Sequence, residues 1–160
     1  MSRIIQLETT IHAPAERCFL LSLSVDLHQE STIQSKEKAI AGTTRGIMDS
    51  GDFVTWQAVH FGLTFKMTTK IARYQRPFYF VSEMVKGPFK RIYHQHIFKE
   101  ENGITTMTDL FEFEAPLGLL GKIAETLFLE KHMKELLKTR NKLIKQVAEG
   151  NSWQKFLIAE

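Results

Sequence analysis

The chain has 160 residues, the size of one ordinary domain and enough to bury a hydrophobic core. Its hydrophobic content of 43%, with 24% charged residues, excludes an intrinsically disordered chain. The net charge is +3, but the basic residues are scattered and no stacking-aromatic motif accompanies them, so we expect no nucleic-acid partner.

The first 31 residues predict a strand followed by two short helices. Residues 5–11 alternate between apolar and polar side chains, as in a strand with one buried face. Pro14 is suited to the start of a helix, and apolar residues then recur at helical spacing over residues 14–23. A second short helix or a turn is expected over residues 25–31.

The N-terminal segment also bears on location, because it alternates and lacks the apolar core of a signal peptide. No stretch of the sequence reaches membrane-spanning length, so we expect no integral membrane segment. Cys18 is the only cysteine, which excludes an intrachain disulfide and fits a reducing compartment. We therefore expect a cytoplasmic protein.

Residues 36–115 predict an antiparallel meander of strands. The strands are separated by turn signals at residues 42–51, Arg76-Pro77, Gly87-Pro88 and Asn102-Gly103. After Pro116 the hydrophobic period returns to 3.6, which predicts a long amphipathic helix that ends at Gly150. The apolar stripe of that helix consists of Ile123, Leu127, Met133, Leu136, Leu137, Ile144 and Val147.

We expect one domain over residues 1–149 and a C-terminal tail over residues 150–160. Trp153, Phe156 and Leu157 give the tail an apolar edge at helical spacing. This edge would dock either on the body of the same chain or on a second subunit, so a homodimer stays open.

The most informative segment is the predicted strand over residues 89–98. Its alternation places Ile92, His94, His96 and Phe98 on one face. The neighbouring strands repeat this design, with Phe80, Ser82 and Met84 on one side and Met107, Asp109, Phe111 and Phe113 on the other. Large apolar side chains with a few polar groups are typical of a small-molecule site, so the pattern predicts a curved sheet around a pocket.

Several short motifs then occur in a fixed order along residues 3–147. They are Trp56 with His60-Phe61-Gly62, Gly87-Pro88-Phe89, residues 94–98 (HQHIF), Asp109, residues 116–121 (PLGLLG) and Arg140. In this combination the chain resembles the helix-grip superfamily, and within it a bacterial branch. That superfamily contains START lipid-transfer domains, birch-pollen-allergen-like proteins and polyketide cyclase/dehydrase-like proteins. The resemblance implies an α+β fold in which a curved antiparallel sheet wraps around a long C-terminal helix.

One position departs from the resemblance. Ile92 stands where many members of the superfamily have a Trp or Phe. The substitution would change the volume of the pocket and leave the fold unchanged, so the size of the ligand cannot be carried over.

The polar candidates of the predicted pocket are His60, His94, His96 and Asp109. A neutral imidazole offers one donor and one acceptor, so a histidine held by Asp109 could orient a ligand oxygen. It could instead act as a general base, as in the polyketide cyclases that the chain resembles. Two histidines at i and i+2, with a third histidine and a carboxylate, would also suit a metal ion, although this spacing usually occurs without one. We expect no metal and no cofactor.

Asp109 should hold a partner such as His96 or Arg140, because an unpaired buried carboxylate is costly. Arg140 falls on the apolar stripe of the long helix, which suggests that it points inward. A purely structural ion pair would explain these residues nearly as well as a functional one. Residues 116–121 form either a flexible gate or a tight strand-to-helix turn.

We therefore expect binding of a hydrophobic or amphipathic small molecule, as a carrier, sensor or sequestering protein. The alternatives are a cyclase/dehydrase-like enzyme with His94, His96 and Asp109 as catalytic candidates, and a ligand-free interaction module. The module is favoured if Trp56, Phe111 and Phe113 fill the pocket. The expected ligand-binding residues are Trp56, His60, Phe65, Met67, Phe80, Met84, Ile92, His94, His96, Asp109, Phe111 and Phe113.

Overall fold

The computed structural model describes residues 2–116 and 123–157 and contains one seven-stranded antiparallel sheet within them. The strand order is β1-β7-β6-β5-β4-β3-β2, so every sequential pair from β2 to β7 is adjacent and β1 closes the far edge against β7. The strands are β1 (Ser2–Ile11), β2 (Lys38–Gly42), β3 (Phe53–His60), β4 (Leu63–Gln75), β5 (Tyr79–Lys86), β6 (Arg91–Glu101) and β7 (Ile104–Glu114).

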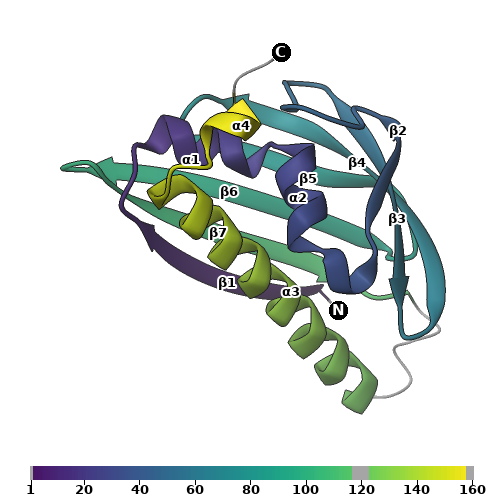
Figure 1. Cartoon of the computed structure of the whole chain (residues 1–160). Helices are drawn as coiled ribbons and strands as arrows, with labels where there is room; N and C mark the ends of the chain where they lie inside the picture. The colour runs from purple at the N-terminus through teal and green to yellow at the C-terminus, as the bar shows by residue number, and fades with distance from the viewer. Residues whose placement is uncertain (1, 117–122, 158–160) are drawn as a thin grey trace.

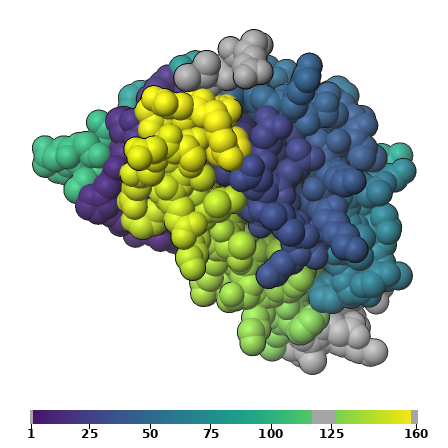
Figure 2. All heavy atoms as spheres, in the orientation of Figure 1, coloured from purple at the N-terminus to yellow at the C-terminus, as the bar shows by residue number. Residues whose placement is uncertain are grey.

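The helices lie on the inner side of this curved sheet (Figure 1). They are α1 (Ala15–Ser22), α2 (Val25–Ser31), the long α3 (Ile123–Glu149) and the short α4 (Gln154–Leu157), with a 3-10 turn at Ile33–Ser35. The side chain of Ser24 accepts a hydrogen bond from the amide of Leu27 and so caps the start of α2. On the face shown in Figure 2, α2 and α3 pack beside each other and cover the sheet.

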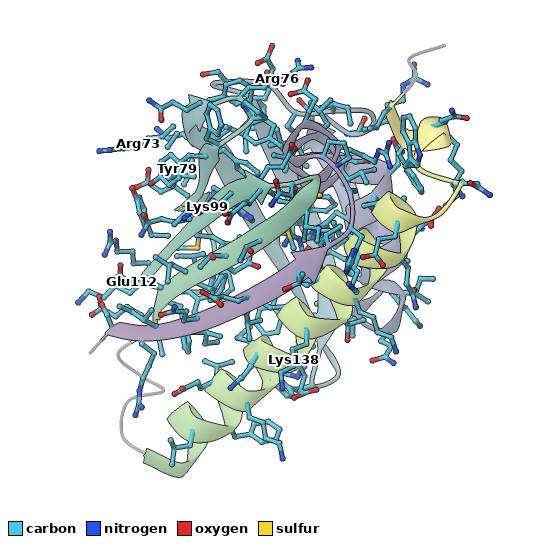
Figure 3. The ribbon with its side chains drawn as sticks, turned by 90° about the vertical axis from the view of Figure 1, so that its left-hand side faces the viewer. Arg73, Arg76, Tyr79, Lys99, Glu112 and Lys138 are labelled. Atoms are coloured by element: carbon cyan, nitrogen blue, oxygen red, sulfur yellow. The ribbon has the colours of Figure 1, made fainter. Side chains whose placement is uncertain are left out.

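The two faces of the sheet differ as the alternation predicts. In β6 the residues Ile92, His94, His96 and Phe98 are all buried, and the residues between them are half-buried. Figure 3 shows Arg73, Tyr79 and Glu112 on the side of the sheet that is turned away from α3. The sequence therefore predicts both the meander and the inward face of its central strands.

The main core lies where α1, the end of α3 and the sheet meet. Phe19 of α1 is fully buried and contacts the rings of Tyr74, Phe80 and Phe98 edge-on, with centroids 5.3–5.5 Å apart. Such edge-to-face contacts add to the free energy of burial. A second, smaller cluster surrounds Phe113 and Ile92 near the middle of α3.

The predicted elements agree closely with the observed ones, with one difference in α3. Figure 1 shows the N-terminal end of α3 projecting beyond the sheet. Leu127, expected on the apolar stripe, is accordingly 53% exposed. The side chain of Ile123 and the loop over residues 117–121 lie outside the described residues, so neither the gate nor the turn is tested.

The tail packs on its own chain. Phe156 of α4 is buried in the main core, and the guanidinium of Arg17 lies 4.1 Å from the centre of the Trp153 ring. The apolar edge predicted at residues 153, 156 and 157 is thus covered by α1. Within the described residues no helix combines the length and apolarity needed to cross a membrane.

The packing of Phe19 leads to a stability prediction. Phe19→Ala removes a buried ring with three aromatic neighbours, so we expect a loss of about 3–5 kcal/mol in the free energy of unfolding. Phe78→Ala is the control, because Phe78 is 61% exposed and its loss should change stability by less than about 0.5 kcal/mol. Urea unfolding of both variants measures the difference, and equal effects would contradict the core assignment.

Candidate functional site

A cavity of about 510 Å³ lies between the inner face of the sheet and helices α2 and α3. Its walls are mostly aromatic and aliphatic. Nine residues expected to bind ligand line it: Trp56, His60, Phe65, Met67, Phe80, Ile92, His94, His96 and Phe111. Phe61, Leu63 and Phe128 also line it, and each is more than half exposed, so they mark its mouth.

Three expected residues do not reach the cavity surface. Phe113 is fully buried in the second core cluster, and Met84 packs against that same cluster. Asp109 is fully buried behind the cavity wall. These positions follow the alternation correctly, but neighbouring side chains stand between them and the cavity.

The Asp109 carboxylate is the centre of a buried polar network. Its Oδ1 accepts a hydrogen bond from His94 Nε2 at 2.7 Å, and its Oδ2 accepts one from Asn141 Nδ2 at 2.7 Å. Arg140 Nη1 lies 3.5 Å from Oδ1 and donates to Asn141 Oδ1 at 3.0 Å. Strands β7 and β6 and helix α3 each contribute a member.

The partners of Asp109 include the expected His96 and Arg140, but the closest ones are His94 and Asn141. The carboxylate bonds His94 most closely, whereas His96 Nδ1 lies 3.4 Å from Oδ1 and Arg140 lies at 3.5 Å. Asn141 was not expected at all. Arg140 points inward as predicted and is 7% exposed.

His96 is held mainly by stacking. Its ring lies on Phe80, with centroids 4.0 Å apart and planes 14° apart, and it also contacts the His94 ring, with centroids 3.7 Å apart. Its Nδ1 lies 3.5 Å from Arg140 Nη2, which also donates to the carbonyl oxygen of Ser22 at 3.5 Å. These contacts fix the ring at the closed, inner end of the cavity.

Burial dominates the electrostatics of this network. It lowers the pKa of His94, although the hydrogen bond to Asp109 opposes the shift. Burial, His94 and Arg140 together lower the pKa of His96 well below its ordinary value. Burial tends to raise the pKa of Asp109, but the hydrogen bond from His94, the charge of Arg140 and the hydrogen bond from Asn141 outweigh it and hold this pKa below its usual range. The resting network therefore has one carboxylate, one guanidinium and two neutral imidazoles.

A second polar group lies near the mouth. His60 Nδ1 and His132 Nε2 are 3.2 Å apart, which joins β3 to α3. His28 Nε2 lies 2.9 Å from Glu37 Oε1, and the His28 ring lies 4.3 Å from the ring of Trp56. His60 therefore pairs with His132, and it lines the same cavity as His94 and His96.

His94, His96 and Asp109 could supply three metal ligands, because one ligand atom of each lies within 4.8 Å of the others. The neighbouring groups make this arrangement a poor cation site. The Arg140 guanidinium already lies beside Asp109 Oδ1 and His96 Nδ1, and a metal there would face its positive charge. The hydrogen-bond donors around the carboxylate take the same lone pairs that a metal would need.

The missed members of the site are Asn141, Ser22 and His132. Asn141 lies four residues after Leu137 and three before Ile144, both buried, so its place on the inward stripe of α3 was readable from the sequence. The carbonyl of Ser22 and the pairing of His132 with His60 depend on how separate elements meet, for which the sequence has no signal.

The neutral state of the two inner histidines leads to a pH prediction. In the unfolded chain an imidazole has a pKa of about 6.5, so below that pH the unfolded state binds protons that the folded state excludes. We expect the free energy of unfolding to fall between about pH 6.5 and about pH 5, by up to about 1.4 kcal/mol per pH unit for each imidazole. The lowered pKa of Asp109 acts only at lower pH, since its stabilisation is lost as the pH falls below the carboxyl range.

Urea unfolding across this pH window measures the slope in the wild type and in His96→Phe, which keeps an aromatic ring against Phe80. The variant should have a shallower pH dependence. Phe111→Leu, on the same cavity wall but without a titratable group, controls for a general loss of stability and should keep the wild-type slope. Stability that is constant or rises as the pH falls would contradict the burial of neutral imidazoles.

No family model and no curated protein sequence matches this chain. Solved proteins with a similar structure include the three that follow. Aromatase/cyclase ZhuI from Streptomyces sp. R1128 has a TM-score of 0.74 and 14% identity, over 93% of this chain and 94% of that one. Major latex-like protein 151 from Panax ginseng has a TM-score of 0.65 and 13% identity, over 93% and 99%. A protein from Thermus thermophilus has a TM-score of 0.66 and 18% identity, over 89% and 97%. These similarities show that the chain has the helix-grip fold, the architecture that the sequence motifs indicated.

Proposed function

We propose that this protein binds a hydrophobic or amphipathic small molecule in the cavity between sheet and α3, as a carrier, sensor or sequestering protein. The observation that carries the proposal is the cavity itself, which has a volume of about 510 Å³ and opens between exposed apolar residues. Ligand pockets of drug-sized molecules have volumes of roughly 300–1,000 Å³. Apolar side chains predominate in its lining, which suits a ligand with an apolar body.

The ligand-free interaction module is the weaker interpretation. It required Trp56, Phe111 and Phe113 to fill the pocket, whereas Trp56 and Phe111 form walls of an open cavity and Phe113 lies behind them. A cavity lined by apolar groups is a cost in stability unless something occupies it. Ligand binding offsets that cost.

Native mass spectrometry of the protein as purified is the direct test. A retained small-molecule mass that is released by denaturation would support the proposal and name the ligand. If none is retained, titration with 1-anilinonaphthalene-8-sulfonate tests the cavity, and the absence of saturable binding would count against the proposal.

A cavity-filling substitution provides a sharper test. Ile92→Trp replaces an aliphatic side chain on the cavity wall by a large aromatic ring. Many members of the superfamily that the sequence resembles have a Trp or Phe at this position. Overpacking against a bound probe costs about 1–3 kcal/mol, so we expect affinity for the probe to fall by roughly tenfold or more. Val85→Trp is the matched control, because Val85 is 59% exposed. Equal affinities in the two folded variants would contradict the cavity as the binding site.

A second candidate function is acid/base catalysis of the cyclase/dehydrase type, favoured by the 2.7 Å bond between His94 and Asp109. A carboxylate that orients an imidazole and stabilises its charged form is the usual support of a histidine general base. His94 therefore replaces His96 as the better candidate for the base. One of the structurally similar proteins is itself named an aromatase/cyclase.

The two functions separate in one paired experiment on the ligand that co-purifies. For a carrier, His94→Gln should weaken binding by about the worth of one hydrogen bond, 0.5–1.5 kcal/mol, with no product formed by any form of the protein. For an enzyme, His94→Gln and Asp109→Asn should lower turnover by roughly 10²–10⁴ at near-constant affinity. We expect no turnover in the wild type. Product that disappears in both variants would contradict the carrier proposal.

A further inference from the structure

The hydrogen bonds around His94 determine which of its ring nitrogens carries the proton. Its Nε2 lies 2.7 Å from Asp109 Oδ1, and an ionised carboxylate can only accept. Nε2 must therefore carry the hydrogen and donate it. In the neutral ring this leaves Nδ1 as an unprotonated acceptor.

The tautomer of His96 is determined in the opposite way. Its Nδ1 faces Arg140 Nη2 at 3.5 Å, and a guanidinium can only donate. Nδ1 must therefore be the acceptor, so in the neutral ring Nε2 carries the hydrogen. Asp109 Oδ1 lies 3.4 Å from the same Nδ1 and forms no hydrogen bond with it.

The two remaining nitrogens face the cavity. Every fully buried side-chain nitrogen or oxygen of the described residues has a hydrogen-bond partner, and neither His94 Nδ1 nor His96 Nε2 has one within the described protein. These atoms are therefore among those that the cavity reaches, and both histidines line its wall. Their ring centroids are 3.7 Å apart, so one ring presents an acceptor and the ring next to it presents a donor.

We propose that this pair binds a hydroxyl group of the ligand, whether phenol, enol or alcohol, at the inner end of the cavity. The hydroxyl donates its hydrogen to His94 Nδ1 and accepts the Nε2 hydrogen of His96. The inference rests on the proposed function, because it specifies which chemical group of the bound molecule reaches the closed end.

The same pair disfavours other common polar groups. A carboxylate would place its lone pairs against the unprotonated Nδ1 of His94. The positive charge of Arg140 is already balanced by Asp109, so the inner end has no net charge to offset the cost of burying an anion. A ketone or ether could accept from His96 but would leave His94 Nδ1 without a donor.

Four fluorescent probes with one apolar body test the inference: pyrene, 1-methoxypyrene, 1-hydroxypyrene and pyrene-1-carboxylate. We expect 1-hydroxypyrene to bind most tightly, by roughly threefold to tenfold over 1-methoxypyrene for the one hydrogen bond to His94. The carboxylate should bind most weakly.

If no probe binds, the proposed function itself fails. Equal affinity for the three neutral probes would keep the cavity and overturn the hydroxyl site, as would tightest binding of the carboxylate, which would indicate pairing with Arg140.

Variants assign the preference to single atoms. His94→Phe removes the acceptor and should abolish the preference for hydroxyl over methoxy, while His96→Phe should abolish the preference for methoxy over pyrene. Tyr93→Phe is the control, because it removes a hydroxyl from the same strand on the outer face, and it should keep both preferences.

A measurement on the unmodified protein covers variants that fail to fold. Nitrogen-15 chemical shifts of the histidine side chains report which ring nitrogen is protonated. The inference expects Nε2–H tautomers at both His94 and His96, and an Nδ1–H tautomer or an imidazolium at either would overturn it.

Discussion

The structure depends on one buried carboxylate. Asp109 is inaccessible to solvent, and an unpaired charge in that position would cost several kcal/mol. Its short bonds to His94 on β6 and Asn141 on α3 supply the compensation, with the Arg140 guanidinium beside them. Because the partners come from the sheet and from the long helix, satisfying this one charge determines where α3 crosses the sheet. The network therefore forms the back wall of the cavity and also connects the sheet to α3.

The position of this network along α3 explains why a cavity exists. Beyond Arg140, the C-terminal part of α3 carries Ile144 and Val147 into the main core, where Phe156 of the tail joins them. Toward its other end the helix packs through half-buried Leu129 and Met133 against the second, smaller cluster, and Phe128 is left 59% exposed at the mouth. A helix that is packed into the main core at one end and less deeply buried at the other leaves an opening between itself and the curved sheet. The His60–His132 contact bridges that opening near the mouth.

The sequence predicted the architecture because each element carries a clear period, and it predicted the inward face of β6 because alternation fixes which side chains share a side. It did not predict that His94 and Asn141, rather than His96 and Arg140, would be the closest partners of Asp109. Directly across the strand pair, Asp109 faces His96, whereas His94 faces Phe111. The short bond nevertheless runs diagonally to His94, and diagonal neighbours on a sheet are within reach of long side chains. The pairing of His60 with His132 was not predicted either, because it joins β3 to α3 across the cavity.

A shared fold leaves the chemistry of the cavity open. In this chain that chemistry depends on which ring nitrogens of His94 and His96 carry a hydrogen, rather than on where the side chains lie. Aromatase/cyclase ZhuI and the ginseng latex-like protein have the same architecture at 13–14% identity to this chain. In this chain, Asp109 and Arg140 each bind one nitrogen of a histidine and thereby determine what the other nitrogen offers to the cavity. Replacing Asp109 by a hydrogen-bond donor, or Arg140 by an acceptor, would reverse the tautomer of the histidine that it contacts, with no change in the backbone. In the proposed hydroxyl site, the selectivity is thus set by Asp109 and Arg140, the two groups that hold the histidines.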